Sequence, residues 1–192
     1  MNPNTIVVLS TSLPVAMPWL ANAKGVVQMW WPGDEGGPAT ANILLGRASP
    51  GGRLPITWPE RLDQTVAQDP TGHPERTNHG VDGKTTYSEG IFVGYRWFDK
   101  QGLKPLFPFG YGLSYTTFQY SGLKVVRALV QFDRVTLAAG QSKLLTLRVE
   151  PRRLQYWSVA ANRWTTATGP RTVYVGASSS DIRLQAEVNI AS

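Results

Sequence analysis

The sequence predicts an α/β unit followed by an all-β module. Three observations favour this: two apolar runs near the N-terminus that each precede a helix signal, an aromatic and glycine-rich middle, and alternating apolar residues in the last third. Strands that alternate with helices are typical of a parallel sheet with crossover helices. Short alternating strands separated by turns are typical of a β-sandwich. The 192 residues suffice for one domain or two small ones.

The first third contains signals for two strands and two helices. Pro18 can start one helix, and Pro38 in a first turn with Gly46 just past the end delimits the other. The expected strands cover residues 6–9 and 26–31, and the expected helices cover residues 19–23 and 38–45. Two parallel strands cannot bury both their faces well, so we expect the edge of a larger α/β domain.

The middle of the chain is irregular. Residues 60–86 form a long polar stretch, and loops of that length are either functional or disordered. Residues 87–118 are rich in aromatic residues and glycine and show no helical period, so we expect an extended connector that packs along another surface.

The last third reads as β-structure. Residues 143–149, 171–176 and 184–190 alternate between apolar and polar, and turn signals occur at residues 139–140 and 168–170. Residues 120–192 offer about five or six strands, whereas an immunoglobulin-like sandwich needs about seven. We therefore expect a shortened sandwich.

Composition excludes several functional classes. The net charge of +6 comes from scattered basic residues without any nucleic-acid motif, so no nucleic-acid partner is expected. The absence of cysteine removes disulfides and thiol chemistry. No stretch is long and apolar enough for a membrane span or a signal core, so we expect no membrane partner and a cytoplasmic location for the chain as written. Full-length relatives of such a chain can be exported.

Carboxylates are the first candidates for chemistry on sugars, which requires an acid and a base. Glu89 lies at the end of the polar loop beside aromatic residues, where a structural bond, for instance with Arg96, is the simpler interpretation. Asp34 and Glu35 precede the second expected helix, where they can act as caps. His73 and His79 have no spacing typical of metal ligands, so no metal site is expected.

The strongest information comes from longer motifs. Five segments resemble consecutive motifs of the family 3 glycoside hydrolases of the β-glucosidase type, in the family's order and spacing. They are PVAMPW (residues 14–19), WWPGDEGG (30–37), SPGGRLPITWP (49–59), YSEGIFVGYRWFD (87–99) and PLFPFGYGLSYTTF (105–118). The remainder is similar to the fibronectin type III-like module that ends many of these enzymes.

The resemblance implies a three-part architecture. In the family, a barrel domain supplies a nucleophilic Asp, and an α/β sandwich domain supplies a general-acid Glu. The two carboxyl groups of a retaining enzyme lie roughly 5 Å apart. The family needs neither a metal nor an organic cofactor. This sequence resembles only the C-terminal part, so neither catalytic role transfers to any of its residues.

The resemblance also divides the chain into three ranges. Residues 1–86 are expected to form part of the α/β sandwich domain with the long polar loop, residues 87–118 the connector, and residues 119–192 a shortened fibronectin type III-like domain. Residues 123–126 resemble the first strand of that domain and residues 130–135 resemble its later strands. We therefore expect a missing stretch with its junction near Arg127.

Three functions remain open on the sequence. The chain is a non-catalytic part of a β-glucosidase-like retaining enzyme that supports or docks on a barrel domain, or that self-associates through open sheet edges. Alternatively, it is a small stand-alone β-glucosidase that uses Glu89 and Glu35 in a new site. As a third possibility, it is a carbohydrate-binding module. The expected ligand is a β-glucoside or oligosaccharide.

Overall fold

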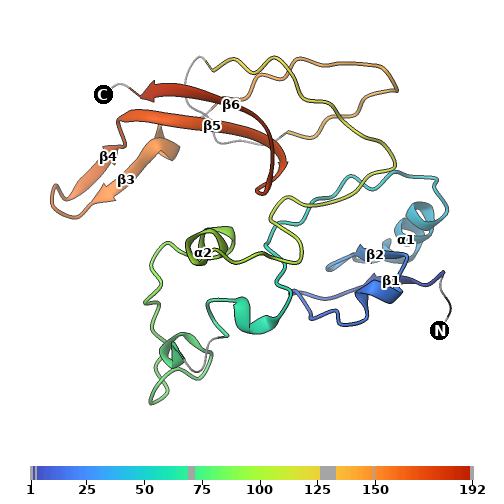
Figure 1. The fold of residues 1–192 in the computed structure, drawn as a ribbon, viewed down its shortest axis with the longest axis horizontal. Helices are drawn as coiled ribbons and strands as arrows, with labels where there is room; N and C mark the ends of the chain where they lie inside the picture. The colour runs from blue at the N-terminus through green and yellow to red at the C-terminus, as the bar shows by residue number, and fades with distance from the viewer. Residues whose placement is uncertain (1, 3, 69–71, 126–132, 149, 191–192) are drawn as a thin grey trace. The chain divides into compact units, whose positions relative to one another are not determined.

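The computed structural model describes residues 2, 4–68, 72–125, 133–148 and 150–190. The chain forms two compact units, which Figure 1 shows from the N-terminus in blue to the C-terminus in red. Unit 1 comprises Met1–Phe118 with Ser178–Ser180, and unit 2 comprises Gln119–Ala177 with Asp181–Ser192. The expected junction near Arg127 lies outside the described residues.

Unit 1 begins with a two-stranded parallel sheet. Strand β1 (Ile6–Leu9) pairs with β2 (Gly25–Gln28), with Ile6 opposite Gly25 and Leu9 opposite Gln28. β-branched residues in both strands suit a pleated, half-buried surface. The two strands expected from the sequence are therefore confirmed, although β2 ends before Trp30, whose φ of 55° turns the chain.

The helices around this sheet differ from the expectation. The short helix expected over residues 19–23 is a three-residue 3₁₀ helix, η1 (Leu20–Asn22), which is much shorter than the crossover helix of a typical parallel sheet. Helix α1 (Gly36–Leu44) follows β2, and Gly46, whose φ is +70°, lies just past its C-cap Leu45. Glu35 occupies the N-cap position, but its side chain makes no capping hydrogen bond.

The core of unit 1 surrounds Trp58, which is 2% exposed. Its indole nitrogen donates to the carbonyl of Val15 at 2.9 Å, and its backbone forms a bridge with Phe107. Trp30 packs its ring 6.1 Å from that of Trp58. These contacts join segments that lie far apart in the sequence, so burial of a few aromatic rings organises most of unit 1.

The middle of the chain contains a helix that the sequence did not predict. Helix α2 (Tyr95–Gln101) lies within the stretch expected to be extended, and it buries Trp97 and Phe98. Gly94 and Gly102 flank it with φ of 57° and 62°, conformations that glycine adopts at little cost. Seven residues are too few to reveal a helical period, which explains the error. Two 3₁₀ helices, η2 (Leu62–Gln64) and η3 (Pro74–Arg76), lie in the long polar loop.

The described part of unit 2 contains two hairpins. The 3₁₀ helix η4 (Pro151–Leu154) leads into β3 (Gln155–Ser158), which pairs antiparallel with β4 (Arg163–Thr166). Two ten-residue strands, β5 (Gly169–Ser178) and β6 (Asp181–Ile190), form the second sheet. The strands expected at residues 171–176 and 184–190 are confirmed within β5 and β6. The strand expected at residues 143–149 is wrong over its described part, because residues 143–148 adopt no regular structure.

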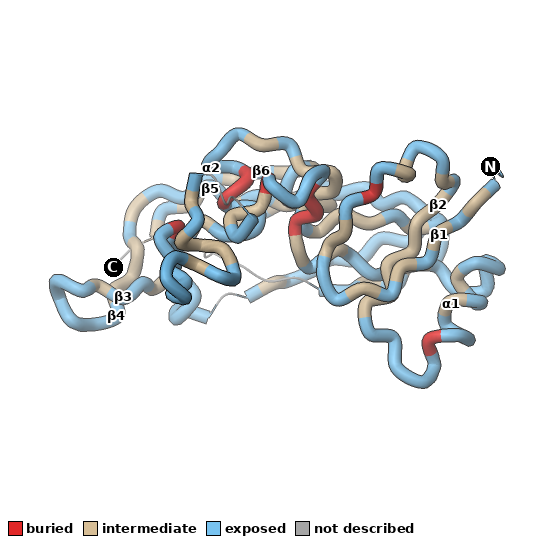
Figure 2. Tube along the Cα trace, turned by 90° about the horizontal axis from the view of Figure 1, so that it is seen from below, coloured by how far each residue is buried: buried red, intermediate tan, exposed pale blue. Residues whose placement is uncertain are grey.

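The described residues of units 1 and 2 differ in burial. The buried residues, red in Figure 2, all belong to unit 1. None of the residues described in unit 2 is buried. The described part of unit 2 therefore has hairpins but no closed core.

Candidate functional site

Glu89, the best carboxylate candidate from the sequence, is buried in unit 1. Its side chain is 7% exposed, and one carboxylate oxygen lies 3.8 Å from Nε of Arg76. The side chain of Arg76 is 9% exposed, and its guanidinium lies 5.5 Å from the centre of the Trp97 ring. The expected partner Arg96 is therefore wrong: its guanidinium lies over the ring of Tyr95 instead.

A hydrogen-bond chain connects Arg76 to a second carboxylate. Nε of Arg76 donates to Oγ of Ser88 at 2.7 Å, and that hydroxyl donates to Oε1 of Glu75 at 2.6 Å. Nδ1 of His73 lies 3.0 Å from the same Glu75 oxygen. We call Glu75, Arg76, Ser88 and Glu89 the arginine cluster. Burial of charged groups is tolerated where they are paired in this way.

The two carboxylates of the arginine cluster lie in different environments. The hydrogen bond from Ser88, bonding to its own backbone and the nearby His73 together lower the pKa of Glu75 to about 2. Nη1 of Arg76 and Oε2 of Glu89 are buried without a hydrogen-bond partner among the described residues. Glu89 thus keeps its ion pair with Arg76, while its more exposed neighbour Glu75 accepts the hydrogen bonds.

The arginine cluster is suited to holding structure rather than to cleaving a glycosidic bond. A general acid or nucleophile must approach the reacting atoms of the sugar within hydrogen-bond distance. Burial of the Glu89 side chain, which is only 7% exposed, prevents that approach, and its ion pair with Arg76 engages the carboxylate inside unit 1. The sequence did not single out Arg76 or Ser88, because their hydrogen-bond partners lie 12 and 13 residues away in the chain.

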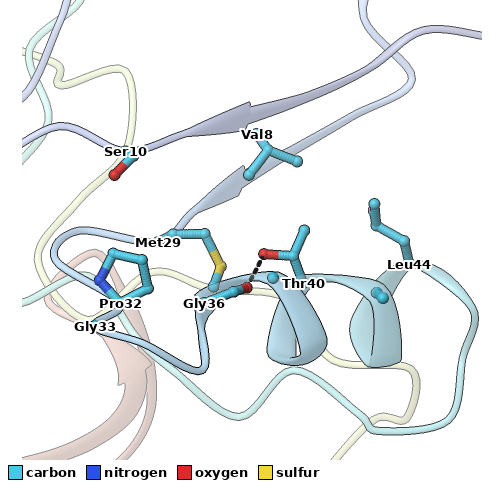
Figure 3. A pocket seen from close by; sticks show the side chains of 10 residues that line it. Val8, Ser10, Met29, Pro32, Gly33, Gly36, Thr40 and Leu44 are labelled. Atoms are coloured by element: carbon cyan, nitrogen blue, oxygen red, sulfur yellow. Dashed lines mark hydrogen bonds between the residues drawn. The ribbon is translucent and has the colours of Figure 1, made fainter.

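Glu35 lies in a different part of unit 1. It is exposed beside an apolar hollow of about 510 Å³ between the β1–β2 sheet and helix α1. Figure 3 shows side chains around this hollow, among them Val8, Met29 and Leu44. Its lining includes the hydroxyls of Ser10 and Thr40 but, among the residues that the structure describes, no carboxylate. The hollow therefore resembles an uncovered packing surface more than a hydrolytic cleft.

The described residues form neither a metal-binding group nor a membrane-spanning helix. Over the described ranges, no three His, Asp or Glu side chains come together as a metal site would require. Within those same ranges, no helix combines the length and apolarity needed to cross a membrane.

Two known domain families match successive parts of the chain. Residues 1–95 match the glycosyl hydrolase family 3 C-terminal domain, and residues 114–179 match the fibronectin type III-like domain. The chain belongs to glycosyl hydrolase family 3. A β-glucosidase from Rhizobium radiobacter is 35% identical over 98% of this chain, and β-glucosidase B from Emericella nidulans is 34% identical over 98%.

Solved structures of β-glucosidases share the fold of this chain. DesR, a β-glucosidase from Streptomyces venezuelae, matches with a TM-score of 0.88 and 40% identity over 99% of this family 3 chain. A β-D-glucoside glucohydrolase from Trichoderma reesei matches with a TM-score of 0.87 and 26% identity, also over 99%.

This family 3 chain is much shorter than its relatives. It spans 28% of the Rhizobium radiobacter and Emericella nidulans enzymes and 29% of DesR. The alignment with the Rhizobium radiobacter enzyme covers 233 residues, which exceeds the 192 residues of this chain by 41. The relative therefore carries at least 41 residues inside the matched region that have no counterpart here.

Proposed function

We propose that this chain is the C-terminal region of a β-glucosidase-like retaining glycoside hydrolase, that it is non-catalytic by itself, and that it docks on a barrel domain. The observation that carries this proposal is the pairing of an almost complete match to family 3 enzymes with coverage of less than a third of their length. The candidate carboxylates support it, because Glu89 is buried in an ion pair and Glu35 lies elsewhere.

The hollow beside α1 is the proposed docking surface. Two parallel strands and one helix leave apolar side chains exposed: Val8 is 41% exposed, Leu44 41% and Ile6 50%. Parallel sheets are normally covered on both faces, so these residues are suited to contacts with further strands and helices. We infer that β1, β2 and α1 form the edge of a larger α/β sandwich, completed by the chain that carries the barrel.

Reconstitution tests the proposal. A family 3 β-glucosidase from which the region matching this chain has been removed is mixed with this chain, and hydrolysis of an aryl β-glucoside is measured together with complex formation. We expect no turnover by either part alone and recovered turnover in a stable complex. Turnover by this chain alone that disappears in Glu89→Gln would contradict the proposal and favour a stand-alone glycosidase.

Matched variants locate the docking surface. Met29→Glu places a charge in the hollow and is expected to weaken the complex at least tenfold, because an unpaired charge is costly in an apolar contact. Leu144→Glu is the control, since Leu144 is 90% exposed in unit 2. Equal effects of the two variants would contradict docking through the hollow.

Carbohydrate binding is a second candidate, favoured by the β3–β4 hairpin. Trp157 and Trp164 lie opposite each other with ring centres 5.5 Å apart, and they are 46% and 47% exposed. Exposed indole faces can stack on sugar rings. Titration with cello-oligosaccharides is expected to show saturable binding that Trp157→Ala removes and Tyr174→Ala retains. An absence of saturable binding would exclude this candidate.

A further inference from the structure

Strand β6 has a regular two-sided pattern. Its even-numbered residues are apolar: Ile182, Leu184, Ala186, Val188 and Ile190. Its odd-numbered residues are polar: Asp181, Arg183, Gln185, Glu187 and Asn189. Side chains alternate between the faces of a strand, so β6 presents one apolar and one polar face along its whole length.

The outer edge of β6 is open within the described residues. Among the described strands, β5 is the one that pairs with β6, so no described strand lies along the other edge of β6. An unpaired strand edge presents N–H and C=O groups that another strand can bind. β5 carries Pro170, which lacks an amide donor, near its start. β6 contains no proline, so every one of its residues has a backbone N–H for pairing.

The described part of unit 2 also lacks an interior that would stabilise two strands. None of its described residues is buried, and two-stranded sheets alone are marginal in water. Relatives carry at least 41 residues in the matched region that this chain lacks. An added strand therefore brings unit 2 hydrogen bonds and apolar contacts that its own described residues do not supply.

We propose that β6 binds β6 of a second copy of this chain, antiparallel and centred on Gln185. The charges of the strand select this partner and this register. In it, each Arg183 lies opposite Glu187 of the other copy, which forms two symmetric cross-strand ion pairs. The complete pairing is Asp181 with Asn189, Ile182 with Val188, Arg183 with Glu187, Leu184 with Ala186, and Gln185 with its own copy.

Neighbouring registers are less favourable. A register centred on Leu184 sets Asp181 opposite Glu187, and one centred on Arg183 sets that residue opposite itself, so both place like charges together. A register centred on Ala186 pairs no charges. A shift by one residue places apolar residues opposite polar ones.

The two charged side chains remain accessible for this contact. Arg183 is 52% exposed and bonds to Asp181 of its own strand through Nη2 and Oδ2 at 2.7 Å. Glu187 is exposed on the same face. An exposed guanidinium has enough donors to bind a second carboxylate while it keeps the first.

Charge exchange on the full chain tests the register. Arg183→Glu and Glu187→Arg each create two like-charge pairs in the symmetric dimer, so each variant alone is expected to dimerise roughly tenfold more weakly than the original chain. Mixing the two variants restores opposite charges at both positions and is expected to form the heterodimer. Sedimentation measures the three dimerisation constants.

Single cysteines test the geometry directly, because the chain has no cysteine of its own. Opposite residues in antiparallel strands have Cα atoms about 5 Å apart, which suits a disulfide. Gln185→Cys is therefore expected to form a covalent dimer under mild oxidation. Asn189→Cys is the matched control on the same exposed face, and its two copies would lie about 27 Å apart, eight residues along the strands.

The outcomes separate clearly. Faster cross-linking of Gln185→Cys than of Asn189→Cys, together with rescue in the mixed charge variants, supports the proposal. A chain that stays monomeric at all concentrations overturns it, as does a dimer indifferent to both charge variants. Neither readout involves glycosidase activity or a barrel domain, so the result is independent of the proposed function.

Discussion

Units 1 and 2 of this chain differ in how far their described residues bury apolar side chains. All nine buried residues in the described part of the chain belong to unit 1, and they include Trp58, Trp97 and Phe98. Unit 2 has the longest strands, β5 and β6, yet its described residues leave Trp157 and Trp164 nearly half exposed. In the described part of unit 2, long regular strands therefore form without the burial of side chains in a core.

The physical reason lies in where apolar surface can be placed. Burial of apolar surface contributes about 25 cal/mol per Å², and it requires atoms on all sides of the side chain. Unit 1 surrounds Trp58 with segments from residues 15, 30 and 107. In the β3–β4 hairpin, the Trp164 ring contacts Trp157 and the Arg152 guanidinium, and both tryptophans stay nearly half exposed.

Truncation of one tryptophan in each unit should give the largest difference in unfolding free energy between the two units. Trp58→Ala removes a ring that is 2% exposed and is expected to destabilise the chain by about 3–5 kcal/mol. Trp164→Ala removes a half-exposed ring and is expected to destabilise it by less than about 2 kcal/mol. Urea unfolding followed by tryptophan fluorescence and circular dichroism measures both. Similar losses would show that unit 2 has a core as developed as that of unit 1.

Removal of the Glu89 charge should have the next largest effect. Glu89→Gln leaves Arg76 buried without its full counter-charge and is expected to cost about 3 kcal/mol of unfolding free energy. Asp63→Asn is the control, because the ion pair of Asp63 with Arg61 is more than 60% exposed and is worth less than about 1 kcal/mol. Equal effects of the two variants would contradict a structural role for the arginine cluster.

Two glycine-to-alanine variants compare a position where an added Cβ would clash with one where it would meet no atom. A Cβ at Gly176 of β5 would lie 2.2 Å from the carbonyl oxygen of Asp181, so Gly176→Ala is expected to destabilise the β5–β6 hairpin by about 1–3 kcal/mol. A Cβ at Gly37 of α1 meets nothing within 4 Å, and Gly37→Ala is expected to stabilise the helix by about 0.5–1 kcal/mol. Thermal unfolding distinguishes the two, and a tolerated Gly176→Ala would mean that the hairpin opens easily.

The titration of Glu75 should have the smallest effect. Its pKa is lowered from 4.5 to about 2, so the folded chain binds this proton less readily than the unfolded chain. The stabilisation by this carboxylate is therefore complete above pH 4.5 and is lost as the pH falls towards 2. NMR titration of Glu75 and acid unfolding measure it. Ser88→Ala removes the main cause and is expected to raise the pKa, and an unchanged pKa would contradict the role of that hydroxyl.

Local signals in the sequence predicted several elements well. The apolar run of residues 6–9, the strand signals at residues 171–176 and 184–190, and the Pro38 and Gly46 helix signals correspond to β1, β5, β6 and α1. Each depends on neighbours in the chain, through propensity, alternation or capping. The motifs of residues 87–118 also identified the family, which the matches to family 3 confirm.

Long-range contacts account for what the sequence missed. Helix α2 was missed because its stability comes from burial of Trp97 and Phe98 rather than from a repeated pattern. Arg96, the example of a partner for Glu89 that the sequence offers, lies seven residues away, whereas the fold brings Arg76 to Glu89 from thirteen residues away. Tertiary packing overrides local preference at both places.

The sequence by itself determined the family and the alternation of β6, since both are written in the order of neighbouring residues. Only the tertiary structure decided that Glu89 is buried against Arg76 and that β6 has an open edge among the described residues. Burial of a side chain and pairing of a strand depend on which distant segments come into contact, and the local pattern of residues along the sequence does not specify those contacts.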